Sequence, residues 1–176
     1  MDTPKSQWYY GQKPRSMMPP PVTFRLATRD DLPAIVRMLV DDALGNEWDR
    51  YDEPLSPLYY EAFQAIQADK NNELVVAQSG DEVVGVLQLT YIPGLLFQGG
   101  WRALIEGVRV SSTVRGCGVG SAFLKWAIAR ADARGCHLAQ LTTNKLRTDA
   151  KRFYERLGFQ ATHEGMKIPL RRAQKI

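Results

Sequence analysis

The residues with the clearest chemical character form a glycine-rich segment, RGCGVGS, which begins at Arg115. An apolar run, Ala103–Val110, precedes it and helix-forming residues follow it, which predicts a strand, a turn and a helix start. The first N–H groups of a helix lack partners within the helix and carry the positive end of its dipole. Glycines let a phosphate approach these groups without meeting a Cβ, and Arg115 adds a fixed positive charge. The segment therefore predicts a site for a phosphate-bearing ligand.

Two familiar glycine-rich phosphate motifs do not fit this segment. A P-loop ends in Gly-Lys-Ser/Thr, whereas Gly120 is followed by Ser121 and Ala122. The dinucleotide fingerprint G-x-G-x-x-G needs a third glycine where this chain has Ser121, and an acid about 20 residues further on, near Gln140. Neither requirement is met, so both motifs are excluded.

The segment does match R-x-x-G-x-G, starting at Arg115, and it resembles the acetyl-CoA motif of the GNAT family of N-acetyltransferases. The resemblance continues in LTTN (Leu141–Asn144) and in AKRFYERLGF (Ala150–Phe159). The matching segments follow one another in the family's order over roughly Thr23–Leu170, so a chance match is an inadequate explanation.

The resemblance implies an α/β (α+β) fold, with a mixed, twisted sheet of six to seven strands flanked by about four helices. Acetyl-CoA, the co-substrate, would lie where two parallel strands splay apart, with its pyrophosphate on the amides of the glycine turn. The residues expected to contact it are Val108, Arg109, Val110, Arg115, Gly116, Cys117, Gly118, Val119, Gly120, Ser121, Asn144 and Lys151. No metal is expected, because the two histidines are too few and too scattered to form a site.

Glu106 is the candidate general base. An amine attacks only when it is neutral, and a lysine-like amine of pKa about 10.4 costs roughly 4–5 kcal/mol to neutralise at pH 7. Family members often carry an acid at this place, in IExxxV, and it can take the proton through a water. A carboxylate that only binds the acceptor is the alternative role. The acids of Asp41–Glu53 and Glu164 are the competing bases.

Two further groups follow from the resemblance. The backbone N–H of Val110 would donate to the oxyanion, and Tyr154 would protonate the departing thiolate. The spacing of Tyr154 from Phe153 and Leu157 also fits a core position. Asn144 would hydrogen-bond pantetheine. The alternative interpretation is that it only forms the turn that ends a strand.

Cys117 lies at a helix start, where thiolates are stabilised, but no histidine obviously pairs with it, so a nucleophilic role is not expected. Direct attack of the amine in a ternary complex is expected instead.

Composition indicates one globular domain. The 176 residues are 44% apolar and 24% charged, with a net charge of +4 that suits an anionic co-substrate. Residues 1–21 are rich in proline and polar residues, which predicts a flexible tail before a GNAT domain of residues 22–176. No membrane span or apolar signal sequence is visible, so the cytoplasm is the expected location.

Periodicity and capping residues predict the elements by range. The predicted helices are one capped by Thr28 or Asp31 and ending about Ala43, one at about Pro57–Ala68, one that runs from the glycine turn to Gly135, and a last one capped by Thr148. The predicted strands are Val22–Ala27, Glu73–Gln78, Glu82–Ile92, Trp101–Val110, His137–Thr143 and closing strands within Phe159–Leu170.

The acceptor is predicted only as a class. Asp41–Glu53 carries six acids with Trp48 and Tyr51 between them, which suits a small cationic amine. A solvated charged loop is the alternative interpretation. A non-catalytic acyl-CoA-binding regulatory module and a protein or peptide N-acetyltransferase are the alternative functions. Nucleic-acid binding through the aromatic residues of the tail is less expected, and dimerisation is common in the family.

Overall fold

The computed structural model describes residues 21–41, 49–168 and 170. Its elements are β1 (Val22–Leu26), the 3₁₀ turn η2 (Arg29–Asp31), α1 (Leu32–Val40), α2 (Pro57–Ala68), β2 (Asn72–Ser79), β3 (Glu82–Pro93), α3 (Leu96–Gly99), β4 (Trp101–Val110), the 3₁₀ turn η3 (Ser112–Val114), α4 (Val119–Ala133), β5 (Cys136–Leu141) and α5 (Thr148–Arg156).

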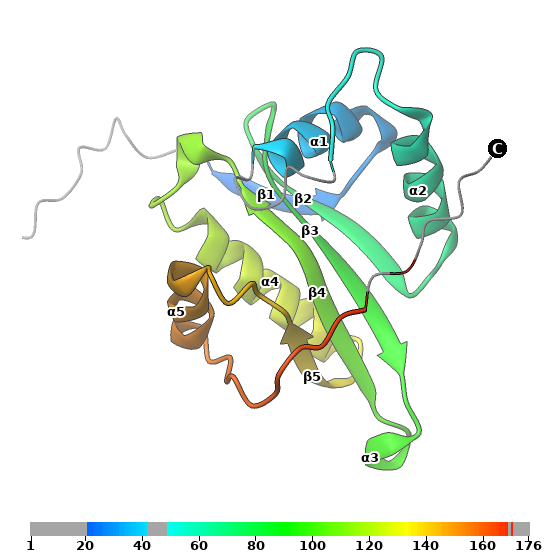
Figure 1. The fold of residues 1–176 in the computed structure, drawn as a ribbon, viewed down its shortest axis with the longest axis vertical. Helices are drawn as coiled ribbons and strands as arrows, with labels where there is room; N and C mark the ends of the chain where they lie inside the picture. The colour runs from blue at the N-terminus through cyan, green and yellow to red at the C-terminus, as the bar shows by residue number, and fades with distance from the viewer. Residues whose placement is uncertain (1–20, 42–48, 169, 171–176) are drawn as a thin grey trace, which may run out of the picture.

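The strands form one sheet in the order β1-β2-β3-β4-β5. The first four are antiparallel to their neighbours, and β5 is parallel to β4 because α4 connects them. Figure 1 shows α1 and α2 on one side of the sheet and α4 and α5 on the other. The predicted mixed sheet between helices is confirmed.

The strand count is corrected from six or seven to five in the part of the chain that the structure describes. The predicted closing strands within Phe159–Leu170 are absent from the described residues of that segment. From Met166 onward its apolar side chains alternate but are almost fully exposed, with Met166 at 95% and Ile168 at 81%. An alternating pattern forms a strand only when a neighbouring strand pairs with it and buries one face, and neither occurs here.

Two apolar clusters fix which face of the sheet each side chain occupies. Ala103 and Ile105 of β4 pack with Phe123 of α4 in the first cluster. Val76 and Val86 pack with α1 and α2 in the second. Because successive strand residues point to opposite faces, the residues between these positions can be assigned to one side or the other.

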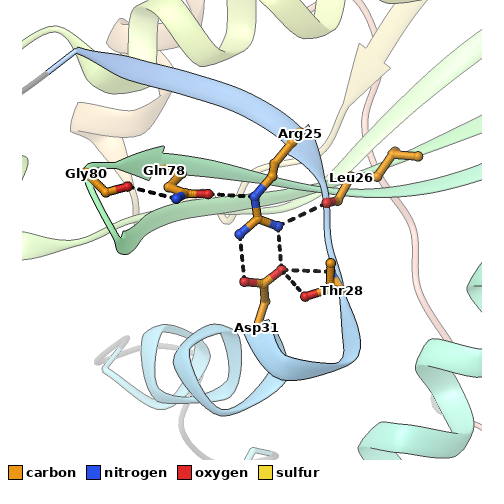
Figure 2. Close-up of polar contacts among 6 residues, drawn as sticks. All are labelled: Arg25, Leu26, Thr28, Asp31, Gln78 and Gly80. Atoms are coloured by element: carbon orange, nitrogen blue, oxygen red, sulfur yellow. Dashed lines mark hydrogen bonds and ion pairs between the residues drawn. The ribbon is translucent and has the colours of Figure 1, made fainter.

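A hydrogen-bonded cluster around Arg25 joins β1, β2 and the start of α1 (Figure 2). Its guanidinium donates to both carboxylate oxygens of Asp31, at 2.6 and 2.9 Å, and its Nε donates to Gln78 Oε1 at 2.6 Å. The backbone N–H and hydroxyl of Thr28 donate to the same carboxylate. These bonds lower the pKa of Asp31 from 3.8 to about 2, so the carboxylate is charged at neutral pH.

A second polar cluster anchors α4 to the sheet. Glu73 is buried on β2 and accepts from Arg130 of α4, with 2.8 Å between Nη2 and Oε1. Tyr91 Oη donates to the other carboxylate oxygen at 3.1 Å. Burial and the neighbouring Glu73 carboxylate raise the pKa of Tyr91 to about 12. The cluster gives α4, and therefore the turn before it, a fixed place on the sheet.

Several predicted boundaries are corrected. α1 ends at Val40 rather than about Ala43, and β5 ends at Leu141. Thr148 is the first residue of α5, and its N-cap is Arg147. Of the tail predicted over residues 1–21, residues 1–20 lie outside the described residues. The acids Asp42 and Glu47 and the aromatic Trp48 also lie outside them. In the described part of the chain, no helix is long and apolar enough to span a membrane.

Candidate functional site

The glycine turn leads from β4 into α4 and leaves its backbone open. Gly116 and Gly118 have φ of +78° and +83°, a backbone conformation that residues other than glycine adopt only at an energetic cost. A Cβ at either position would have no heavy atom within 4 Å. Gly118 is the N-cap of α4 and makes no side-chain capping bond. The first N–H groups of a helix have no partner within it, so this open turn could offer donors to an anion, and the phosphate contacts predicted there stay predictions.

Arg115 lies beside this turn. Its exposed side chain donates from Nε to the carbonyl of Val110 at 3.3 Å. A single long bond to a neutral oxygen leaves the remaining guanidinium donors for a phosphate.

β4 and β5 part in the middle of β4. Their pairing ends at Ile105–Leu141, whereas β4 stays paired with β3 as far as Val110. Opposite Val86–Gln88, β4 carries one extra residue, and Gly107 at φ +61° lies in this bulge. A bulge bends its strand and increases its twist, so it carries the end of β4 away from β5.

The N–H of Val110 faces the side that β5 has left. The next residue, Ser111, donates its N–H to Val84 O of β3 at 2.9 Å. Neighbouring N–H groups of an extended chain point to opposite sides, so Val110 N–H points away from β3. Val110 O points the same way and accepts from Arg115. A backbone donor is thus directed into the space between the parted strands.

Glu106 and Tyr154 approach this place from opposite faces of the sheet. Glu106 follows the core residue Ile105, so it lies on the α1 and α2 face, where it is exposed. Tyr154 of α5 packs against the cluster on the α4 face. The centre of its ring lies 5.3 Å from that of Phe153 and 6.0 Å from that of Phe159. The predicted pair is therefore separated by the sheet except where β4 and β5 part.

Burial raises the pKa of Tyr154, and the charges of Arg109 and Arg147 oppose this rise. The phenol is therefore protonated at neutral pH and can donate a proton. Its packing against the core cluster agrees with the second interpretation, as a core residue, although the residue is only half-buried.

The other predicted contact residues fall into two groups. Asn144 forms a turn after β5, in which its Oδ1 accepts from Leu146 N at 2.9 Å, and this bond leaves its amide N–H groups available to a ligand. Lys151 is exposed, and its Nζ lies 3.8 Å from Glu155 Oε1. Val119 is buried in the core, so only its backbone can contact a ligand. Cys117 is exposed, with its thiol 3.9 Å from Arg115 O.

Val108, Val110 and Gly120 lie around the same opening. Val108 and Val110 pack as half-buried residues on the α4 face. A Cβ at Gly120 would lie 3.6 Å from Val110 and 3.5 Å from Phe153. Arg109 donates to Val108 O at 2.9 Å. Ser121 is half-buried in the first turn of α4.

Two of the acids that compete with Glu106 form ion pairs, and a third, Asp49, accepts a hydrogen bond from Tyr59. Glu164 pairs with Lys145 at 3.3 Å, and Glu53 pairs with Arg37 at 3.1 Å. Tyr51, one of the aromatic residues expected to bind a cation, has the Arg37 guanidinium over its ring at 4.5 Å. Glu106, in contrast, forms no ion pair with any described residue.

Sequence reasoning missed the bulge at Gly107 and the polar side chains that face Glu106 from β3. An isolated glycine in a strand pattern signals a bulge, and Gln88 and Thr90 interrupt an otherwise apolar strand. Among the described residues, no cluster of three or more metal-binding side chains is present.

Comparisons with known proteins identify the family of the chain. A family model described as Acetyltransferase (GNAT) family matches residues 39–159. Aminoalkylphosphonate N-acetyltransferase of Salmonella typhimurium is 32% identical over 144 residues, which cover 82% of this chain and 88% of that protein.

Solved structures extend the similarity. A crystal structure described as a transcriptional regulator from Bacillus halodurans C-125 is 57% identical, with a TM-score of 0.83 over 85% of this chain and 99% of that one. A putative acetyltransferase from Agrobacterium tumefaciens str. C58 is 25% identical, with a TM-score of 0.75 over 84% and 99% of the two chains.

Proposed function

Since the chain belongs to the GNAT family of acetyltransferases, we propose that it moves the acetyl group of acetyl-CoA to the primary amine of a small molecule. One observation carries this proposal. Glu106 and Tyr154 lie on opposite faces of the sheet, at the place where β4 leaves β5 and Val110 N–H is directed between them. An acetyl-CoA bound on the α4 face and an amine bound on the α1 and α2 face could meet there.

The chain has the groups needed to hold acetyl-CoA. The open N–H groups of residues 116–121 and the Arg115 guanidinium would bind its pyrophosphate. Val108, Arg109 and Val110 would line the pantetheine path, with the Asn144 amide and Lys151 as further donors.

The reaction needs three things from the protein. Glu106 takes a proton from the ammonium, directly or through a water, and the amine nitrogen attacks the thioester carbonyl. Val110 N–H stabilises the oxyanion. As the C–N bond forms and the C–S bond breaks, Tyr154 Oη gives its proton to the leaving sulfur. The nitrogen loses its second proton to water as it becomes the amide, and the tyrosine phenolate takes a proton back from water. The thioester is already activated, so positioning and these groups suffice without an acyl-enzyme.

For the acceptor, the relative from Salmonella typhimurium suggests a primary amine that also carries an anionic group. The acidic loop suggested a small cationic amine, but Glu53 and Tyr51 both contact Arg37. That pairing weakens the argument for a cation site. We therefore rank an aminoalkylphosphonate above a diamine.

A non-catalytic acyl-CoA-binding regulatory module remains the second candidate, because the similar Bacillus halodurans structure is described as a transcriptional regulator. Such a module would bind acetyl-CoA without consuming it. A carboxylate that forms no ion pair with any described residue and a protonated phenol, both at the opening, favour an enzyme.

The test is acetylation of four amines, followed by mass spectrometry of the product: 2-aminoethylphosphonate, ethanolamine, 1,4-diaminobutane and an alanyl peptide. Direct detection is preferable to a thiol reagent, because Cys117 is exposed and would react with it. Fastest turnover of the phosphonate is expected. Acetyl-CoA binding with no acetylated product from any amine would overturn the proposal and favour the regulatory module.

A further inference from the structure

A chain of amide hydrogen bonds crosses the α1 and α2 face of the sheet and ends beside Glu106. Gln88 of β3 is the cross-strand partner of Glu106, so their side chains share one face. Leu74, the partner of Gln88 on its other side, packs with α1 and α2, which identifies that face. Gln88 is half-buried and Glu106 is exposed, so both border the side from which the amine would come.

The orientation of the Gln88 amide is determined step by step from α2. Asp69, at the end of α2, accepts from Asn71 N at 2.9 Å and from Asn72 Nδ2 at 2.7 Å. Both bonds lower the pKa of the Asp69 carboxyl, which is therefore an acceptor only. Asn72 must then turn its NH₂ group to Asp69 and its oxygen to the sheet.

The Asn72 oxygen in turn fixes Gln88. It accepts from Thr90 Oγ1 at 2.7 Å and from Gln88 Nε2 at 3.1 Å. With its NH₂ group committed to an acceptor, Gln88 presents its Oε1 as an acceptor, and no donor among the described residues binds it. Two acceptors, this oxygen and the Glu106 carboxylate, thus stand on neighbouring strands.

We propose that Gln88 Oε1 and the Glu106 carboxylate together bind the ammonium group of the acceptor, and that Asn72 is the positioning residue that holds the Gln88 amide in this orientation. The inference rests on the proposed function and specifies its acceptor side. A primary ammonium has three N–H donors, so it can bond to both oxygens and still give a proton to Glu106. A neutral amide suits this place better than a second carboxylate, which would hold the proton on the amine.

The proposal makes the site selective for unhindered primary amines. A protonated tertiary amine has one N–H and cannot bond to both oxygens. A quaternary ammonium has none, and it would leave the Gln88 oxygen without a partner.

The test measures the KM of each substrate for Gln88→Met, using whichever of the four amines the wild type acetylates fastest. Methionine keeps the length of the side chain and removes its acceptor. We expect the amine KM to rise about 10- to 100-fold, the size of a lost bond to a charged group, with the KM of acetyl-CoA unchanged. Gln64→Met removes an exposed glutamine of α2 and should change neither KM.

Asn72→Ala provides the second readout. It should raise the amine KM less than Gln88→Met does, and it should have no further effect when Gln88 is already methionine. A structural role for Asn72 would instead add to the effect of Gln88→Met and alter both KM values.

The outcomes separate the inference from the proposed function. An active wild type whose amine KM is unaffected by Gln88→Met overturns the inference and leaves the acetyltransferase intact. A wild type that acetylates none of the amines overturns the proposed function itself.

Discussion

Loss of the Asp31 carboxylate should destabilise the protein in a pH-dependent way. Asp31 has a pKa of about 2 in the folded chain and 3.8 as a free side chain. Each pKa unit corresponds to about 1.4 kcal/mol, so the charged form is stabilised by about 2 kcal/mol at neutral pH. The carboxylate is buried, which limits screening of its bonds to Arg25 and Thr28 (Figure 2).

The sign follows from the lowered pKa. The stabilisation is complete well above pH 3.8 and is lost as the pH falls towards about 2, where the folded protein also binds the proton. Urea unfolding of wild type and Asp31→Asn should therefore differ by about 2 kcal/mol near pH 7 and by about half as much near pH 3.

Asp30→Asn is the matched control, because Asp30 is the exposed neighbour of Asp31 in the same turn. It should change the free energy of unfolding by less than about 0.5 kcal/mol. Equal losses for the two variants, or a loss for Asp31→Asn that is the same at both pH values, would refute the reasoning.

Three further predictions concern the turn, the α4 anchor and the phenol. Gly118→Ala should weaken acetyl-CoA binding, as measured by calorimetry. Gly135 has a similar φ of +76° beyond the far end of α4, and Gly135→Ala should leave this binding unchanged. Equal weakening by the two variants would contradict an anion site at the turn. Glu73→Gln should lower the free energy of unfolding in urea by roughly 1–2 kcal/mol, because a partly exposed Arg130 loses its charged partner; an unchanged value would contradict the anchor. Burial of Tyr154 should move the alkaline fall in kcat above the ordinary tyrosine pKa of about 10, and a fall below that value would contradict its role as acid.

Elements with strong local signals could be predicted from the sequence. The bounds of α2 agree with the prediction, because Pro57 fits the first turn of a helix and Ser56 caps it. The glycine turn into α4 also agrees, because Gly118 takes the left-handed conformation that its residue type allows. Both signals act over a few neighbouring residues.

Features that depend on distant partners could not be predicted in this way. The alternation of Met166 and Ile168 looked like a strand, but a strand exists only when another strand pairs with it. Likewise, the registers that place Gln88 beside Glu106 and within reach of Asn72 join residues 16 or more positions apart. The sequence shows the polar residues in β3 but not which of them face one another.

The candidate site was predicted unevenly for the same reason. The roles of Glu106 and Tyr154 stay predictions, and only their placement on opposite faces comes from the structure. The bulge at Gly107 and the end of pairing at Ile105 explain how the two faces could communicate. Neither follows from residue types alone.

The most direct measurement is the kcat of Tyr154→Phe for acetyl transfer to the best of the four amines, beside the wild type and with acetyl-CoA binding measured for both. The variant keeps the ring that packs on Phe153 and Phe159 and removes only the proton donor. An active wild type and a kcat about 100-fold or more lower in the variant, at unchanged acetyl-CoA affinity, are expected. Equal kcat values, or a wild type that transfers no acetyl group, would contradict the proposed chemistry.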